Sequence, residues 1–197
     1  MNRTIWIRAL VVILVTASST AALAQMEGDE PSKLSVFVGL YSPSGATLRN
    51  EGESMWKVLG VGYALKMDAL GRPKSYVTVE FASSTGDHFS GQRTSLTYMQ
   101  MFRPKPKSED NVGGFYLGAG VSANMVKERV DAQPYEMPPV WLEGEDNSGT
   151  QFGFTAVGGY DFGSNFFAEV RYIKMSELAK DADFSGLVFC LGTRSLF

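Results

Sequence analysis

The sequence is poor in the residues on which most metal and redox chemistry depends. Its 197 residues include one cysteine, Cys190, and one histidine, His88. One cysteine cannot form an intramolecular disulfide, and this pair alone leaves too few ligands for a soft-metal site. Acidic residues outnumber basic ones and give a formal net charge of −3. The composition therefore gives no electrostatic footprint for nucleic acid. We therefore expect no metal, no cofactor and no nucleic-acid partner.

The chain also has no apolar run long enough to span a membrane as a helix. Its longest apolar run lies in the first 24 residues. Arg3 and Arg8 lie at the start of this segment, an apolar run follows at 9–15, and small residues continue to Ala24. This order predicts a secretory signal peptide that is cleaved before Gln25. The run is less than half of the roughly 20 residues that a spanning helix needs. We expect a signal peptide at 1–24, a polar leader at 25–32 and one domain at 33–197.

The rest of the chain consists of segments in which apolar and polar residues alternate. Clusters of Gly, Pro, Asn, Asp and Ser separate these segments, which is typical of strands and turns. No stretch with a helical period of 3.6 competes with this pattern. The alternation predicts eight strands, at residues 33–42, 54–66, 74–84, 92–103, 113–126, 149–162, 165–175 and 184–197.

The composition of the two strand faces indicates which face is outside. In segment 113–126, one face carries only apolar residues from Phe115 to Met125, and the other carries Gly118, Gly120 and Ser122. A solvated face is usually dense in Lys and Glu, whereas the interior of a narrow barrel favours glycine, small polar residues and balanced charges. The charge-free faces suit hydrocarbon. The sequence therefore predicts a transmembrane antiparallel up-and-down β-barrel of about eight strands.

A few ionisable residues fall on the faces that this arrangement turns inward. They are Glu80, Glu169, Arg171 and Arg194. Their opposite signs predict interior ion pairs, which fill a barrel too narrow to conduct. A pore constriction or gate is the alternative interpretation of the same four residues.

Aromatic residues and connection lengths give the expected placement in a membrane. We expect the aromatic residues near strand ends to form interfacial girdles. We also expect external connections near 43–53, 85–91, 127–148 and 176–183, of which the third is a solvated loop that includes Glu128. The expected girdle residues are Tyr41, Trp56, Tyr63, Tyr76, Phe102, Phe115, Tyr160, Phe162, Tyr172 and Phe197.

With this pattern the chain resembles the small eight-stranded outer-membrane barrels formed by the OmpA transmembrane domain, OmpX and the opacity-like adhesins. Barrels of this group end in a glycine-containing motif and a terminal aromatic residue, and Gly192 and Phe197 fit these positions. The resemblance implies a non-enzymatic monomer in the outer membrane, with a structural, adhesion or surface-interaction role through its external loops. Its implied partners are outer-membrane lipids, the barrel assembly machinery and a host or surface ligand.

Two alternatives stay open at the level of sequence. His88 and Ser90 resemble the His-x-Ser pair of PagL, an outer-membrane lipid A deacylase in which the histidine activates the serine. Gly91 stands where that family has asparagine, and the pair falls in an expected loop rather than on a late strand. The second alternative is a soluble periplasmic ligand-binding β-barrel, because alternation alone also fits a barrel with its apolar face inside.

Overall fold

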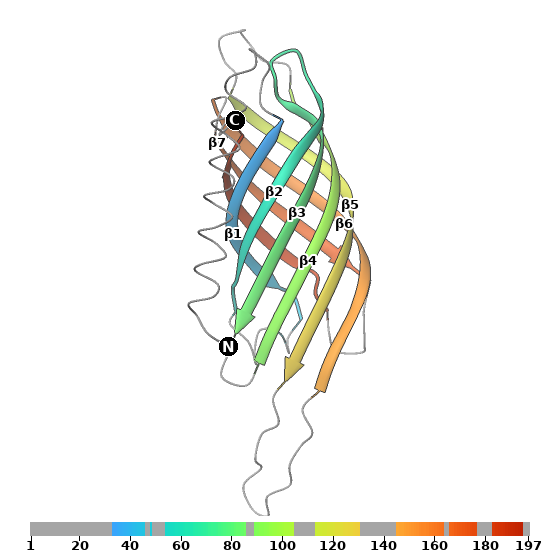
Figure 1. Ribbon diagram of the computed structural model, residues 1–197. Coiled ribbons are helices and arrows are strands. Elements are labelled where there is room, and N and C mark those ends of the chain that lie inside the picture. Colours follow the sequence, from blue (N-terminus) through green and yellow to red (C-terminus); the bar gives the residue numbers. More distant parts are fainter. Residues whose placement is uncertain are drawn as a thin grey trace, which may run out of the picture.

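The alternating segments form eight antiparallel strands that close into a barrel (Figure 1). The computed structural model describes residues 33–45, 48, 54–85, 89–104, 113–130, 145–163, 166–176 and 183–194. The strands are β1 (Leu34–Pro43), β2 (Trp56–Met67), β3 (Pro73–Thr85), β4 (Phe89–Phe102), β5 (Gly114–Val130), β6 (Glu145–Phe162), β7 (Phe166–Met175) and β8 (Gly186–Thr193). The signal peptide and leader expected at 1–32 lie outside the described residues.

Each strand pairs with the next one along the chain, and β8 returns to β1. The closing ladder runs from Val36 opposite Thr193 to Pro43 opposite Gly186. Closure leaves no lateral edge along the body of the barrel, so backbone groups of neighbouring strands satisfy one another. The predicted fold, an antiparallel up-and-down barrel of eight strands, is confirmed. No helix among the described residues is long and apolar enough to cross a membrane.

The third long connection is shorter than the sequence predicted. β5 and β6 continue beyond the expected limits, and their ladder includes Lys127 opposite Ser148 and Val130 opposite Glu145. Polar residues occupy both faces here, so apolar alternation could not mark the strands, and pairing with the neighbouring strand extends them. The placement of Glu128 in a solvated loop is therefore wrong, because its side chain is buried.

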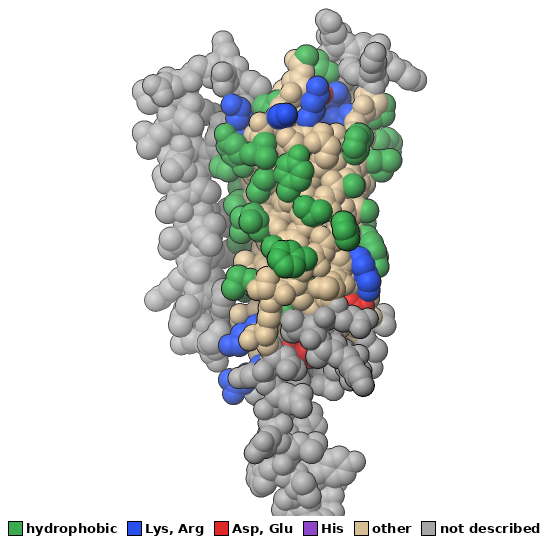
Figure 2. All heavy atoms as spheres, turned by 90° about the vertical axis from the view of Figure 1, so that its right-hand side faces the viewer, with side chains coloured by type: hydrophobic (Ala, Val, Ile, Leu, Met, Phe, Trp, Pro, Cys, Tyr) green, Lys and Arg blue, Asp and Glu red, His purple; other side chains and the backbone are tan. Residues whose placement is uncertain are grey.

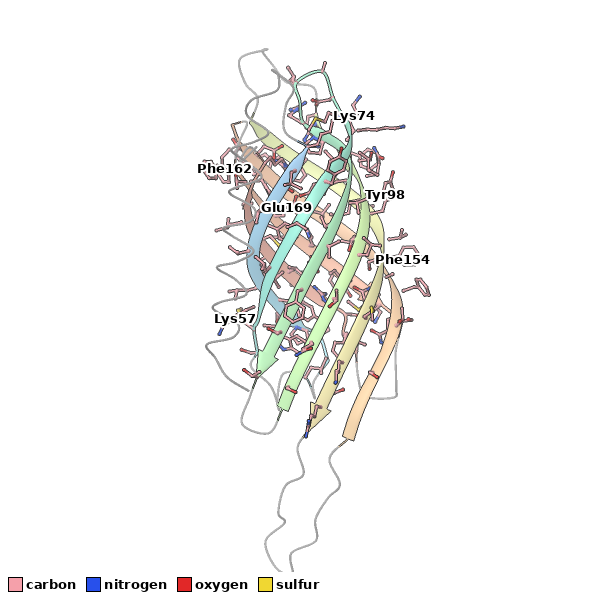
Figure 3. The ribbon with its side chains drawn as sticks, viewed as in Figure 1. Lys57, Lys74, Tyr98, Phe154, Phe162 and Glu169 are labelled. Carbon is pink, nitrogen blue, oxygen red and sulfur yellow. The ribbon has the colours of Figure 1, made fainter. Side chains whose placement is uncertain are left out.

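Side chains alternate between an apolar exterior and a polar interior, as predicted. Phe152 and Phe154 on β6 are 73% and 74% exposed, whereas Gln151 and Thr155 beside them are buried. The labelled side chains of Phe154, Phe162 and Tyr98 point away from the barrel in Figure 3. The molecule therefore has its hydrophobic surface outside, and Figure 2 shows such side chains spread over one face of the wall.

Three of the ten aromatic residues expected in the girdles are inside the barrel instead. Tyr41, Trp56 and Tyr76 are each at most 1% exposed. Tyr41 and Trp56 lie on strands in which both faces carry apolar residues, so the alternation there did not separate inside from outside. Tyr76 shares the parity of the inward residues Thr78 and Glu80 on β3. Position near a strand end was not enough to predict an aromatic residue at a membrane interface.

Interior glycines make room for these inward aromatic rings. A Cβ built on Gly60 would lie 2.2 Å from the Phe37 ring, and one on Gly192 would lie 2.4 Å from the Phe167 ring. Phe37 stands opposite both Gly60 and Gly192 in the β1 ladders. Glycine is required at these positions because the ring of one strand covers the backbone of the next.

Candidate functional site in the barrel interior

The four interior charged residues predicted from sequence lie in the lumen. Two of them, Glu80 and Glu169, both contact Arg171. The side chains of Glu80 on β3 and Glu169 on β7 are each about 1% exposed or less. Arg171 Nη1 donates to Glu80 Oε2 at 3.0 Å, and Arg171 Nε donates to Glu169 Oε2 at 2.7 Å. This guanidinium therefore connects two strands that lie on different sides of the barrel.

Arg194, which follows β8, continues the network through Glu169. Its Nη2 lies 3.6 Å from Glu169 Oε1 and donates to the Tyr116 hydroxyl at 3.1 Å. The Tyr116 hydroxyl in turn donates to Glu169 Oε1 at 2.6 Å. Arg194 also pairs with Asp161, whose other carboxylate oxygen lies 3.2 Å from Arg103 Nε. The predicted residues thus belong to one connected set.

Three members of the network were not among the residues predicted from sequence. Arg93 on β4 pairs with Glu80 and is fully buried, while Asp161 and Arg103 lie at the opposite end of the chain of ion pairs. A signal for Arg93 was present, because it shares parity with Ser95 and Thr97 on the polar face of its strand. The sequence did not show which of the charged residues on different strands would meet.

Charge in the lumen is balanced, as a low-dielectric interior requires. Among the described side chains, four arginines and four carboxylates are each less than a tenth exposed to solvent. They are Arg93, Arg103, Arg171 and Arg194 together with Glu80, Glu128, Asp161 and Glu169.

Aromatic rings enclose the guanidinium groups on the faces that do not bind carboxylates. The Arg93 guanidinium carbon lies 4.1 Å from the centroid of the Tyr41 ring, and that of Arg171 lies 4.6 Å from the Phe37 centroid. The Arg194 guanidinium carbon lies 4.2 Å from the centroid of the Phe167 ring. These cation–π contacts stabilise the cations and fill the space beside them with carbon.

An apolar cluster follows the ion pairs at one end of the lumen. The rings of Tyr41 and Trp56 meet edge to face at 5.5 Å, and Trp56 meets Phe184 in the same way at 6.0 Å. Leu48 belongs to this cluster and is also fully buried. Ion pairs and packed rings thus occupy successive levels of the interior.

The alternative catalytic pair is not assembled within the described part of the chain. Ser90 lies on β4, paired with Thr85 and Arg129, on the outward face of the wall. His88 lies outside the described residues. Gly192 of the expected assembly signal lies on β8 beside the Phe167 ring, and Phe197 falls outside the described residues.

The arrangement is suited to holding the barrel closed rather than to chemistry. Glu80, Glu169 and Asp161 are each engaged by guanidinium groups, so none presents a free carboxylate for general acid or base work. Among the described residues, no group of three or more metal-ligating side chains comes together. The lumen therefore forms an electrostatic core that joins β3, β4 and β7 with the end of β8.

Comparisons with known proteins identify the class of fold. No protein-family model matches the chain, and no curated protein matches it. Among solved structures, the Neisserial surface protein A (NspA) has 14% sequence identity and a TM-score of 0.50, covering 83% of this chain and 96% of its own. At this identity the likeness shows the fold alone, which is that of the small eight-stranded barrels.

Two further structures of the same kind align over similar lengths. The N-terminal β-barrel domain of OprF from Pseudomonas aeruginosa is 16% identical with a TM-score of 0.49, covering 83% of this chain and 96% of the domain. Ail, the attachment invasion locus protein of Yersinia pestis, is 15% identical with a TM-score of 0.46, covering 84% and 98%.

Proposed function

We propose that this protein is a non-enzymatic barrel of the bacterial outer membrane, with a structural and surface-contact role. The observation that supports it is the inverted distribution of polarity. Large apolar side chains such as Phe154, Leu117 and Leu96 are more than half exposed, while four arginines and four carboxylates are buried inside. Hydrocarbon accepts such a wall, and water does not. A soluble ligand-binding barrel requires the reverse arrangement.

Unequal connections at the two ends support an orientation. Connections at 44–55, 86–88, 131–144 and 176–185 join strands at one end, and those at 68–72, 103–113 and 163–165 join them at the other. Outer-membrane barrels have short periplasmic turns and longer external loops. We place the end with the two longest connections, 44–55 and 131–144, outside the cell.

Among the described residues, the wall at the external end extends further along β4, β5 and β6 than along β7. β6 pairs with β5 from Glu145 onward but with β7 only from Gly153 onward. The β5–β6 hairpin therefore stands beyond β7 by eight residues, or about 26 Å of strand. In the proposed role, this hairpin is the part of the wall that reaches a surface ligand or host molecule.

In the proposed role, the lumen is a filled core and not a channel or catalytic pocket. The Arg171 and Arg194 ion pairs and the Trp56 cluster support this, since they occupy the middle and one end of the barrel. The proposed partners are outer-membrane lipids along the wall and the assembly machinery at the C-terminal strand. The proposed assembly state is a monomer.

A lipid-facing charge tests the proposed membrane position. Phe154→Arg places a cation in the apolar belt, and we expect it to reduce the stability of the inserted barrel by about 2–4 kcal/mol. Ser148→Arg is the matched control, because Ser148 is on the same face of β6 but outside the belt, where the cost falls to about 0–1 kcal/mol. Urea unfolding in phospholipid vesicles measures both variants. Equal stability of the two variants would contradict a membrane-embedded wall.

Fractionation and lipid analysis test the location and the absence of catalysis. We expect the mature chain in outer-membrane fractions, with heat-dependent migration on gels. We also expect an unchanged lipid A profile when the gene is deleted or His88 is replaced by alanine. Recovery in the soluble periplasmic fraction would refute the location, and a changed acylation pattern in both strains would support the deacylase alternative.

A further inference from the structure

The exposed charges among the described side chains of the outer wall are of one sign, although the chain as a whole is acidic. Among the described side chains, every exposed charge on an outward strand face is a cation, and no carboxylate is in the exposed class. Asp68 and Asp183 lie in connections and are partly buried, and the other described carboxylates are inside. The exposed wall cations are Lys57, Lys66, Lys74, Lys127, Arg129 and Lys174.

These cations gather at the two ends of the apolar belt. Figure 2 shows basic side chains near the top and the bottom of the wall, with hydrophobic side chains between them. On β2, Lys57 and Lys66 are separated by nine residues, or about 23 Å along the barrel axis for a strand tilted by about 40°. This matches the height of about 25 Å expected for an apolar band.

A β-bulge directs one of these cations outward. Lys66 has the sequence parity of the inward residues Trp56, Val58 and Ala64, yet it is exposed. The β2–β3 register shifts between Ala64 and Lys66, so that Leu65 and Lys66 both face outward. The wall thus departs from regular pairing at the point where regular pairing would bury a lysine.

At the external end, two lysines belong to one continuous polar row. Lys57 pairs with Ser83, Ser83 with Gln92, and Gln92 with Lys127. All four are outward residues on the adjacent strands β2 to β5, so the two ammonium-bearing residues are about 14 Å apart along the wall. Within the described part of the chain, no carboxylate pairs with Lys57 or Lys127.

An acyl-chain surface lies directly next to this row on the membrane side. The neighbouring outward row consists of Leu59, Phe81, Thr94 and Met125, again on β2 to β5. A lipid with its headgroup on the polar row would therefore place its hydrocarbon on these side chains. Lysine binds phosphate as a point charge, and the Ser83 hydroxyl and Gln92 amide supply hydrogen-bond donors between the two charges.

We infer that the row Lys57–Ser83–Gln92–Lys127 is a binding site for a phosphorylated glycolipid of the outer leaflet, the lipid A class. The inference rests on the proposed membrane orientation. Two phosphates on one disaccharide match two cations separated by uncharged donors, and several acyl chains match the broad apolar surface beside them.

The test measures lipid binding to the folded barrel in nanodiscs of zwitterionic phosphatidylcholine. The probes are bisphosphorylated lipid A and its dephosphorylated counterpart, and heat-dependent migration verifies folding of every variant. A basic residue near a membrane surface contributes about 1 kcal/mol of attraction, which is about fivefold in affinity. We therefore expect K57Q/K127Q to weaken binding of the phosphorylated lipid by about 25-fold, and added salt to weaken wild-type binding.

The control variant K66Q/K74Q removes two charges from the opposite end of the wall, on β2 and β3. We expect it to bind within about twofold of the wild-type chain, since neither residue belongs to the row. Equal affinity for the two lipids, or an equal loss in both double variants, would overturn the inference alone. Failure of the wild-type chain to fold into the discs would overturn the proposed membrane location together with it.

Discussion

Replacement of Arg171 by methionine is the most direct test of the interior network. Arg171 is 1% exposed and connects Glu80 and Glu169, which belong to strands far apart in the sequence. Methionine keeps much of the side-chain volume but removes the cation, so two buried carboxylates lose a partner. Breaking a buried ion pair in this way costs about 3–5 kcal/mol.

The structure places the expected loss near the lower end of this range. Glu80 retains its pair with Arg93, and Glu169 retains the Tyr116 hydroxyl at 2.6 Å. We therefore expect a loss of about 3 kcal/mol, which lowers the folding equilibrium constant roughly a hundredfold. Urea unfolding in phospholipid vesicles, followed by tryptophan fluorescence and heat-dependent gel migration, measures this loss.

An exposed ion pair gives the matched control for this experiment. Lys174 pairs with Asp183 at 3.5 Å, and its side chain is 53% exposed. Because solvent screens such a pair, Lys174→Met is expected to cost no more than about 1 kcal/mol. In E169Q/R171M the uncompensated charge of Glu169 is removed, so its loss should be smaller than the sum of the two single losses. A loss below about 1 kcal/mol in Arg171→Met would refute the structural role of the network.

Two further predictions concern the backbone and a turn. A Cβ on Gly39 would lie 2.1 Å from the Phe189 carbonyl oxygen, so Gly39→Ala should destabilise the barrel by about 1–3 kcal/mol in vesicle unfolding. Gly158→Ala is the control: its Cβ would lie 3.6 Å from Leu117, and its free energy of unfolding should differ from that of the wild-type chain by no more than about 0.5 kcal/mol. Equal losses of stability in the two variants would contradict the close approach at Gly39. Partial burial raises the pKa of the Asp68 carboxyl, but hydrogen bonds donated by Arg72 and Leu70 outweigh this and hold the pKa below its usual value. Asp68 therefore stabilises the 68–72 turn above its unfolded pKa and loses this effect as pH falls through its folded pKa; carbon-detected NMR titration should show the lowered midpoint, and an unshifted one would contradict these bonds.

Strand existence and the facing of most side chains could be predicted from the sequence because both are local properties. Successive residues of a strand point to opposite sides, so Phe152 and Phe154 carry the same information in the sequence as in the barrel. The prediction failed where both faces are apolar, at Tyr41 and Trp56, and where both are polar, in the extension of β5 and β6. In these places contact with the neighbouring strand decides the outcome.

The alternation also determined what could fill the interior. With apolar residues outside, the few inward charges have to be paired, and Glu80, Glu169, Arg171 and Arg194 are the residues that the alternation places inside. All four lie in the lumen. The carboxylate of Asp161 and the guanidinium of Arg93 satisfy the same condition, and only the assembled barrel showed that they belong to the same network.

The sequence by itself therefore determined the strands, their two faces and the inverted polarity of this barrel. The tertiary structure alone decided which residues meet across it. Glu80 and Arg171 are 91 residues apart in the chain, and they reach 3.0 Å because barrel closure fixes the stagger between strands. Stagger is a property of the closed ladder and leaves no mark on any single strand, and so the ion pairs, the glycine–aromatic contacts and the lysine row all depend on it.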